Sequence, residues 1–356
     1  MNRRHFLFAL MTSPAWRHAV GADFAPVLAG RALRFPADHG AHPDFRTEWW
    51  YATGWLSLPD GSPLGFQTTF FRVRTGVGEG SASAFAPRQL VLAHAAVADP
   101  RRGRLRHAER SARVGFGHAG YEEGRTSVWV GDWRFGLEQG AYQATVKADD
   151  FAYQLALRPD GPPLLNGAAG FSRKGPDPSQ ASYYYSRPRL AVSGTLGLDG
   201  RSHKVTGQAW LDHEWSSELL PEGAQGWDWI GINLDDGGAL MAFRMRGKDG
   251  RALWAAATLQ AAGGAAQVLA PEAVAFEPGR EWRSPRTGIV YPVAWRLRVG
   301  ARVFELMPLL DDQELDSRSS TGAVYWEGAV RLLEAGRERG RGYLEMTGYG
   351  DRIRVG

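Results

Sequence analysis

Two stretches of this chain repeat one β-hairpin pattern. Each has an aromatic-led strand, an Asp-Gly pair and a return strand that ends in Phe-Arg-x-Arg. The two copies are Trp50, Asp60-Gly61 and Phe71-Arg72-Val73-Arg74, then Trp227, Asp236-Gly237 and Phe243-Arg244-Met245-Arg246. An Asp-Gly pair between apolar strands indicates a tight hairpin turn. The repeat therefore predicts antiparallel sheets that are built from hairpins and occur in two similar copies.

A second aromatic pattern follows each copy. Tyr183-Tyr184-Tyr185 precedes Trp210-Leu211-Asp212, and Tyr325-Trp326 precedes Tyr343-Leu344-Glu345. Aromatic strands can resemble one another by chance, because short patterns have low specificity. Two pairs in the same order nevertheless favour two tandem, distantly similar β domains.

The chain is long enough for two hydrophobic cores. It has 356 residues, more than a single core usually serves. Residues 220–226 hold Pro and Gly between patterned segments, as domain linkers do. We expect an N-terminal domain over residues 23–220 and a C-terminal domain over residues 221–356.

Composition and alternation favour an all-β fold. With 45 Gly, 20 Pro and 14 Trp, the chain favours strands and turns over helices. Every second residue is apolar in residues 127–137 and 293–299, which predicts strands with one buried face. Only residues 270–276 suggest a short helical turn. We therefore predict antiparallel β sheets.

Charge and cysteine content exclude several classes of function. The net charge is only +4, with 42 basic residues scattered among 38 acidic ones, so no nucleic-acid partner is expected. The absence of cysteine excludes disulfides, thiolate metal sites and a thiol nucleophile. No Gly-x-Ser-x-Gly elbow or phosphate-binding glycine loop is present, which argues against a serine hydrolase of that type and a nucleotide enzyme.

Residues 1–22 have the pattern of an export signal of the twin-arginine type. Arg3-Arg4 precedes a short apolar run, and Val20-Gly21-Ala22 offers a cleavage site. The run is far shorter than the roughly 18 residues of a membrane span, so we expect no transmembrane segment in the mature chain. The pattern predicts a bacterial periplasmic protein, the alternative being an ordinary basic N-terminus.

Seven motifs together resemble the AttH and carotenoid 1,2-hydratase (hydroxyneurosporene synthase) family, from about residue 35 to the end. They are His42-Pro43, Glu48-Trp49-Trp50-Tyr51-Ala52-Thr53-Gly54, Leu92-Ala93-His94-Ala95-Ala96, Tyr183-Tyr184-Tyr185-Ser186, Trp210-Leu211-Asp212-His213-Glu214-Trp215, Leu234-Asp235-Asp236-Gly237 and Tyr325-Trp326-Glu327-Gly328-Ala329-Val330. The resemblance implies two tandem lipocalin-like β barrels that handle hydrophobic molecules without a redox cofactor. It also implies an ABC-type transporter system as a partner of AttH proteins, and water addition to isoprenoid double bonds in the hydratases.

Residues 210–215 are the strongest candidates for chemistry. Strand alternation places Asp212 and Glu214 on one face and His213 and Trp215 on the other. In an apolar pocket, either carboxylate could be a general acid while His213 orients water and Trp215 lines the wall. The alternative interpretation is a hydrogen-bonded latch between the barrels, since buried polar groups need partners whatever their role.

Further aromatic and polar residues are candidates for the wall of a ligand site. Core packing is the alternative for each of them. The predicted ligand-binding residues are Glu48, Trp49, Trp50, Tyr51, His94, Tyr184, Trp215, Trp227 and Trp229. We expect no metal site, because the His and Asp residues lack a recognised ligand spacing.

These features predict an exported lipocalin-like protein that binds a hydrophobic ligand, such as a lipid or isoprenoid, in or between two β barrels. The alternative is a cofactor-free lyase or isomerase that acts on an isoprenoid double bond. In that case Asp212, His213 and Glu214 would be the catalytic residues.

Overall fold

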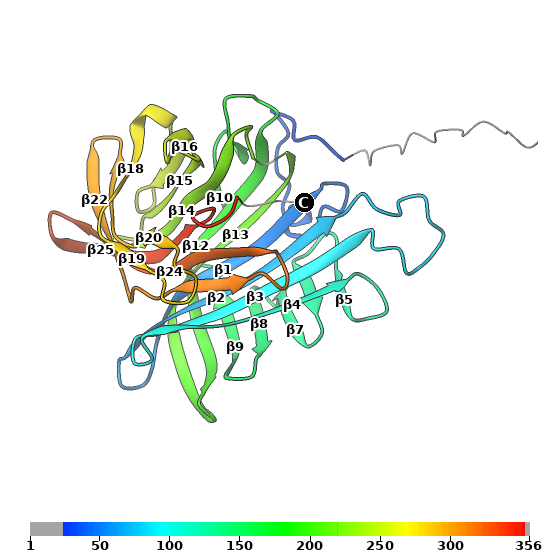
Figure 1. Ribbon diagram of the computed structural model, residues 1–356, viewed down its shortest axis with the longest axis horizontal. Coiled ribbons are helices and arrows are strands. Elements are labelled where there is room, and N and C mark those ends of the chain that lie inside the picture. Colours follow the sequence, from blue (N-terminus) through cyan, green and yellow to red (C-terminus); the bar gives the residue numbers. More distant parts are fainter. Residues whose placement is uncertain (1–23, 219, 353–356) are drawn as a thin grey trace, which may run out of the picture.

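The structure, a computed structural model, describes residues 24–218 and 220–352 and is almost entirely β (Figure 1). The predicted export signal, residues 1–22, lies outside the described residues. Two short 3-10 helices occur among the described residues. The first, η1 (Ala37–His39), precedes the first strand, and the second, η2 (Pro271–Ala273), lies between two strands. The second of these is the helical turn expected in residues 270–276. No helix in the described parts of the chain is long and apolar enough to cross a membrane.

Sheet A is antiparallel and has 13 strands. They are β1 (Thr47–Ser57), β2 (Pro63–Arg74), β3 (Gln89–Asp99), β4 (Arg104–Arg113), β5 (Ala119–Tyr121), β6 (Ser127–Val130), β7 (Trp133–Glu138), β8 (Ala141–Lys147), β9 (Phe151–Arg158), β10 (Leu164–Leu165), β11 (Phe171–Arg173), β12 (Ala181–Leu198) and β13 (Arg201–Glu218). The main order is β4-β3-β2-β1-β13-β12-β9-β8-β7-β6-β5. Because β3 and β4 also contact β5 and β6, the sheet nearly closes into a barrel.

Sheet B follows in the sequence and has ten strands. They are β14 (Ala224–Leu234), β15 (Ala239–Gly247), β16 (Ala252–Gln260), β17 (Ala266–Leu269), β18 (Val274–Pro278), β21 (Trp295–Val299), β22 (Arg302–Pro308), β23 (Glu314–Ser317), β24 (Ala323–Glu334) and β25 (Arg337–Met346). Strands β19 (Glu281–Arg283) and β20 (Val290–Pro292) form a separate pair. Because β18 also contacts β15 and β16, sheet B curves back on itself as sheet A does.

The predicted fold class, two tandem antiparallel β barrels, is confirmed. The two Asp-Gly turns join β1 to β2 and β14 to β15, with Gly61 at φ 82° and Gly237 at φ 86°. One strand prediction is wrong, because residues 127–137 form the hairpin β6–β7 instead of one strand. Gly131, at φ 61°, takes the left-handed conformation that glycine adopts readily, and across this turn the buried positions shift from Val128 and Val130 to Trp133 and Phe135.

The chain passes from sheet A to sheet B between Glu218 and Ala224. This is the segment in which the sequence places the domain boundary. Whether each half folds on its own stays a prediction.

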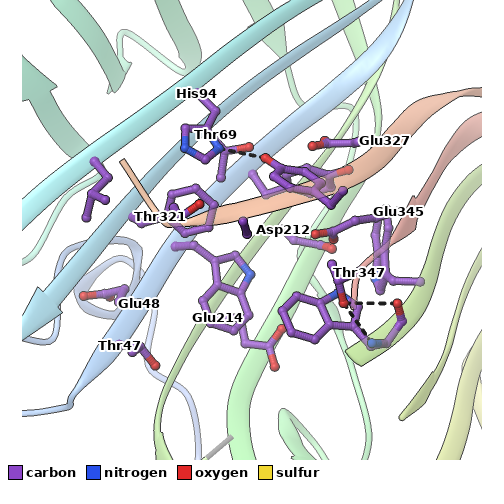
Figure 2. Close-up of a pocket in the computed structure, with 18 of the residues that line it drawn as sticks. Thr47, Glu48, Thr69, His94, Asp212, Glu214, Thr321, Glu327, Glu345 and Thr347 are labelled. Carbon is purple, nitrogen blue, oxygen red and sulfur yellow. Dashed lines mark hydrogen bonds between the residues drawn. The ribbon is translucent and has the colours of Figure 1, made fainter. Parts of the chain in front are cut away.

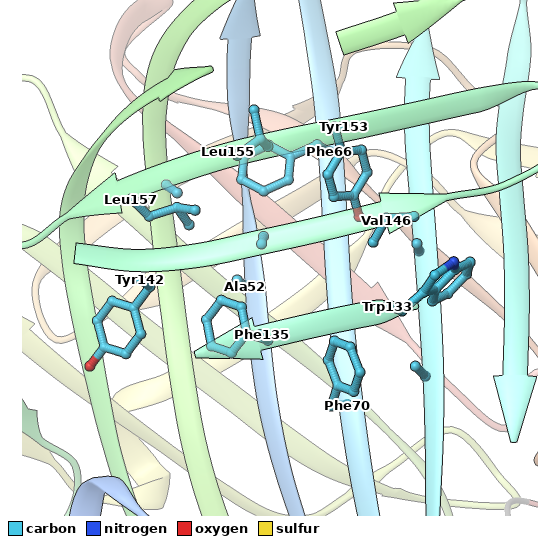
Figure 3. Packing of buried hydrophobic residues seen from close by; sticks show 14 of the residues in the cluster. Ala52, Phe66, Phe70, Trp133, Phe135, Tyr142, Val146, Tyr153, Leu155 and Leu157 are labelled. Carbon is cyan, nitrogen blue, oxygen red and sulfur yellow. The ribbon is translucent and has the colours of Figure 1, made fainter. Parts of the chain in front are cut away.

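The interior of barrel A is filled by large apolar side chains from opposite strands (Figure 3). Trp50 on β1 and Phe66 and Phe70 on β2 meet Trp133 on β7 and Tyr153 on β9. Because side chains alternate along a strand, the neighbours of Trp50 on β1 point out of this barrel. The next residue, Tyr51, accordingly packs in a separate cluster that faces sheet B.

The two barrels pack directly against each other through β1 and β2 of sheet A and β24 and β25 of sheet B. Their shared apolar cluster contains Trp55 and Trp210 from sheet A and Trp229 and Tyr343 from sheet B. Trp55 also donates a hydrogen bond through Nε1 to the carbonyl oxygen of Gly342, at 3.0 Å. The contact is therefore both apolar and hydrogen-bonded.

Gly65 on β2 makes this close approach possible. A Cβ atom at Gly65 would lie 2.7 Å from the Tyr343 hydroxyl and 2.8 Å from the Ala329 Cβ. We expect Gly65→Ala to lower the free energy of unfolding by about 1–3 kcal/mol through overpacking, measured by urea denaturation. Gly80→Ala is the control, since a Cβ there meets nothing within 4 Å. Equal stability of the two variants would contradict the tight packing at Gly65.

Candidate functional site

A pocket of about 290 Å³ lies between the two barrels. Its walls come from β1, β2, β3 and β13 of sheet A and from β14, β15, β24 and β25 of sheet B. Most of the lining surface is apolar, although about half of the lining residues are polar or charged and the rest have apolar or aromatic side chains. These side chains are Trp49, Tyr51, Phe71, Val73, Leu90, Leu92, Trp227, Trp229, Phe243, Met245, Ala323 and Tyr325. Polar groups are set into this wall at a few places (Figure 2).

Lys174 places an ammonium group in the pocket wall. Its Nζ lies 2.7 Å from Oε1 of Glu214, which also accepts a hydrogen bond from Ser182. The same nitrogen lies 4.7 Å from the ring centre of Tyr184 and 4.2 Å from that of Phe243. The cation is therefore held by a carboxylate and by aromatic faces together.

Asp212 faces the pocket and accepts three hydrogen bonds. The donors are Ser186 Oγ (2.6 Å), Trp210 Nε1 (2.7 Å) and Tyr184 OH (2.6 Å). Burial raises the pKa of Asp212 to about 7, although these hydrogen bonds oppose the shift. Tyr184 OH in turn accepts a hydrogen bond from Trp229 Nε1 of sheet B, at 3.0 Å. Asp212 thus lies in the pocket and, through Tyr184, in a link between the barrels.

Glu327 and Glu345 face each other in the pocket as cross-strand partners on β24 and β25. Burial and the charge of Glu345 raise the pKa of Glu327 well above its usual value. Burial, together with the charges of Asp212 and Glu214, raises the pKa of Glu345 to about 7. Two carboxylates that close together cannot both ionise cheaply, so the pair holds a proton near neutral pH.

His94 lies on the opposite side of the pocket from the acidic strands of sheet B (Figure 2). Its Nδ1 pairs with Tyr325 OH at 2.7 Å and its Nε2 with Ser320 Oγ at 2.8 Å. Burial lowers the pKa of His94 to about 3, so the ring is neutral. It fastens β3 to β24 and supplies no positive charge to the pocket.

A second polar network lies behind the pocket, on the other face of β1 and β13. Glu48 accepts hydrogen bonds from His42 (2.7 Å), Arg72 (2.8 Å) and His213 (2.9 Å). Burial alone would raise the pKa of Glu48, but the charges of His42 and Arg72 hold it well below its usual value. Burial lowers the pKa of His213 despite Glu48. The network therefore centres on a buried carboxylate that stays ionised.

Among residues 24–218 and 220–352, only His42, Glu48 and His213 bring three metal-ligating side chains together. Their ligand atoms lie within 4.8 Å of one another. His42 Nδ1 and His213 Nε2 already pair with Glu48 Oε1, and Arg72 neutralises the same carboxylate. The arrangement favours a hydrogen-bonded network over a metal centre.

The structure divides the predicted site residues between the two faces. Those that line the pocket are Glu48, Trp49, Tyr51, His94, Asp212, Glu214, Trp227 and Trp229. Glu48 reaches the edge of the pocket while its carboxylate is engaged in the network behind it. Tyr184 adjoins the pocket through Asp212.

Three predicted site residues lie apart from the pocket, namely Trp50, His213 and Trp215. Trp50 packs in the core of barrel A and stacks on His213, with ring centres 4.8 Å apart. Trp215 stacks on His42 at 3.7 Å. His213 therefore lies on the other face of β13 from Asp212 and Glu214, although the three residues are predicted above to act together if the protein is an enzyme.

Sequence reasoning missed four charged pocket residues, namely Arg72, Lys174, Glu327 and Glu345. For Glu345 a signal existed, because Tyr343-Leu344-Glu345 repeats Trp210-Leu211-Asp212 and both acids face the pocket. Glu327 lies within the motif of residues 325–330, but no repeat of that motif elsewhere in the sequence singles it out. Lys174 follows the three-residue strand β11, where no periodic pattern reveals which way a side chain points.

Known proteins share both the sequence pattern and the fold of this chain. A family model described as AttH-like matches residues 26–349. The chain belongs to the AttH-like family. A crystal structure of a candidate AttH from Nitrosomonas europaea is 53% identical to this AttH-like chain, with a TM-score of 0.87. The match covers 92% of this chain and 100% of that one.

Two more distant structures share the fold of this AttH-like chain. Kievitone hydratase from Nectria haematococca is 14% identical with a TM-score of 0.69, over 92% of this chain and 96% of its own. CghA is 14% identical with a TM-score of 0.53, over 94% of this chain and 97% of its own. A comparison with curated proteins finds no match.

Proposed function

We propose that this AttH-like protein binds one small, largely apolar molecule in the pocket between its barrels. The observation that carries the proposal is the lining of that pocket, whose surface is mostly apolar and which also holds several placed carboxyl groups. Small-molecule sites have this composition. Aromatic rings such as those of Trp49 and Trp227 offer large contact areas to an apolar ligand. Export to the periplasm and an ABC-type transporter partner stay predictions.

Binding is tested with N-phenyl-1-naphthylamine, a neutral apolar fluorophore, in titrations of the wild type and of Ala323→Trp. Ala323 lines the pocket, so a tryptophan there occupies the ligand volume, and we expect affinity to fall at least tenfold. Ala301→Trp is the control, since Ala301 is exposed on a turn. Native mass spectrometry gives the stoichiometry. Wild-type affinity in Ala323→Trp would place the ligand elsewhere.

A second candidate function is proton transfer to or from an isoprenoid double bond, as in a cofactor-free hydro-lyase or isomerase. It is favoured by Asp212, whose pKa of about 7 makes the group a possible acid and base at neutral pH. Tyr184 OH, 2.6 Å away, orients this carboxyl group. A protonated alkene would meet the negative faces of the surrounding aromatic rings.

Catalysis is tested by incubating citronellol, a trisubstituted isoprenoid alkene, with the protein in D2O. Deuterium in recovered citronellol, or a water adduct, is the expected signature in mass spectra. Asp212→Asn should lower the rate by about 10²–10⁴-fold and leave fluorophore affinity nearly unchanged. An equal rate in Asp212→Asn would remove Asp212 from the chemistry.

A further inference from the structure

We propose that the molecule bound in this pocket carries a positive charge, as an apolar amine or a quaternary ammonium whose cationic centre lies between Glu327 and Glu345. This inference rests on the proposed function, because it names the chemical class of the ligand. Its grounds are the pairing of two glutamates, the unpartnered polar atoms beside them and the ammonium already present in the same pocket.

The two glutamates stand directly opposite each other. Cross-strand partners have Cβ atoms about 4.5–5.5 Å apart, and like charges in that position are unfavourable. In the described parts of the chain no lysine, arginine or histidine forms an ion pair with Glu327 or Glu345. Because the pair holds a proton near neutral pH, a single cation between the two carboxyl groups would neutralise the one that is ionised.

Unpartnered buried atoms mark the same place. Glu327 Oε1, Tyr51 OH and Tyr343 OH are buried and make no hydrogen bond of ordinary geometry, although the nearby Tyr51 and Tyr325 hydroxyls act on Glu327 as weak donors that lower its pKa. Glu327 is only 2% exposed and lines the pocket. A buried polar atom that lacks a partner is energetically unfavourable. An ammonium with an N–H would donate to Glu327, whereas a quaternary ammonium would act through its charge alone, and the pocket-lining rings of Tyr51 and Tyr325 would offer their faces to either cation.

The pocket already contains one ammonium held in this way. Lys174 Nζ lies against the Glu214 carboxylate and over the rings of Tyr184 and Phe243. The opposite part of the pocket repeats the carboxylates and the aromatic rings but has no cation of its own. The ligand would supply this second positive charge.

The other charged groups near the pair supply no cation to it. Arg72 is engaged with Glu48, and Lys174 with Glu214. His94 is neutral, since burial lowers its pKa to about 3. Asp212, on β13, accepts hydrogen bonds only from uncharged donors. Asp212, Glu327 and Glu345 thus face one pocket without a compensating cation.

The test uses two probes of nearly the same shape, phenyltrimethylammonium and tert-butylbenzene, which differ by nitrogen in place of carbon. Each displaces N-phenyl-1-naphthylamine from the protein at pH 8. We expect the cation to bind at least tenfold more tightly than the hydrocarbon. In Glu327→Gln with Glu345→Gln this preference should disappear, while Glu305→Gln, on the exposed side of β22, should retain it.

The outcomes separate this inference from the proposed function. If tert-butylbenzene binds as tightly as the cation, or if neither probe displaces the bound fluorophore, the pocket does not select for charge and the inference fails. Either result leaves apolar binding intact. If the fluorophore itself does not bind, the proposed function fails. A preference for the cation that survives the double substitution would place the charge elsewhere and would also overturn the inference.

A pH titration gives an independent readout. The groups that face the pair are Tyr51 on β1, Tyr325 on β24, Tyr343 on β25, Asp212 and Glu214 on β13, Lys174 after β11, and His94 on β3. A bound cation favours the ionised pair and so releases protons. Affinity for phenyltrimethylammonium should rise from pH 6 to pH 8, by up to about tenfold per pH unit for one released proton. Affinity for tert-butylbenzene should stay flat, and a flat response for both probes would contradict the inference.

Discussion

Replacing Arg72 with methionine is expected to lower the free energy of unfolding by about 3–5 kcal/mol, because it removes the permanently charged partner of a buried carboxylate and leaves only His42 to balance it. The Arg72 side chain is 0% exposed and pairs with Glu48, also 0% exposed, at 2.8 Å. It further donates to Gln89 Oε1 (2.9 Å) and to the carbonyl oxygens of His42 (3.0 Å) and Phe45 (2.9 Å). Methionine keeps the apolar stem and removes all these donors. Urea denaturation measures the change.

Two further variants distinguish the loss of the ion pair from a nonspecific loss of stability. Arg72→Met combined with Glu48→Gln removes both charges and should be less destabilised than the sum of the single changes by at least about 1 kcal/mol. Arg296→Met is the matched surface control. Its ion pair with Glu277 is 63% and 51% exposed, and such pairs contribute about 0–1 kcal/mol. Equal unfolding midpoints for Arg72→Met and Arg296→Met would contradict the assigned role of Arg72.

The fold could be predicted from the sequence because its signals are local. The Asp60-Gly61 and Asp236-Gly237 pairs set hairpin turns, and alternation along the strands set their buried faces. The same locality explains the error at residues 127–137. The buried positions change phase at the β6–β7 turn, but Trp129, which is apolar and not fully buried, makes the sequence alternation look continuous with Trp133 and Phe135.

The candidate site could be predicted only in part, because it is formed between the barrels. Alternation correctly separated Asp212 and Glu214 from His213 and Trp215. It could not tell which face meets the pocket, since both faces of β13 are buried. That choice depends on sheet B packing against sheet A, a contact between residues far apart in the chain.

The polar groups of β1 and β13 therefore have two physical roles. Glu48 and His213 point away from sheet B into a network where charge is matched by Arg72 and His42. Asp212 points toward sheet B, where Glu345 adds negative charge instead of matching it. The first group stabilises barrel A, whereas the second carries a stability cost of the kind found at functional sites.

Glu345→Gln is expected to stabilise the protein above pH 7, because this cost arises from ionising Glu345 in the pocket. The pKa of Glu345 is raised from 4.5 to about 7 in the folded state. Between these values the folded protein binds more protons than the unfolded chain, so stability falls as pH rises from about 4.5 to 7. At 1.36 kcal/mol per pKa unit, the loss is about 3 kcal/mol above pH 7. Glutamine cannot ionise, so the variant escapes this loss.

The gain should therefore depend on pH in a defined way. At pH 5 the carboxyl group of Glu345 is mostly protonated in the folded protein, and Glu345→Gln should differ little from the wild type. At pH 8 its unfolding midpoint in urea should be higher than that of the wild type.

Part of the pH dependence of stability should remain in the variant, because the pKa of Asp212 is also raised to about 7. Glu305→Gln, at an exposed position, should have no such effect. Equal stabilisation at both pH values would mean that the gain does not arise from the ionisation of Glu345. A variant that is destabilised at pH 8 would instead mean that Glu345 is ionised and satisfied in the folded state. The pocket would then have no unpaired charge for a ligand to neutralise.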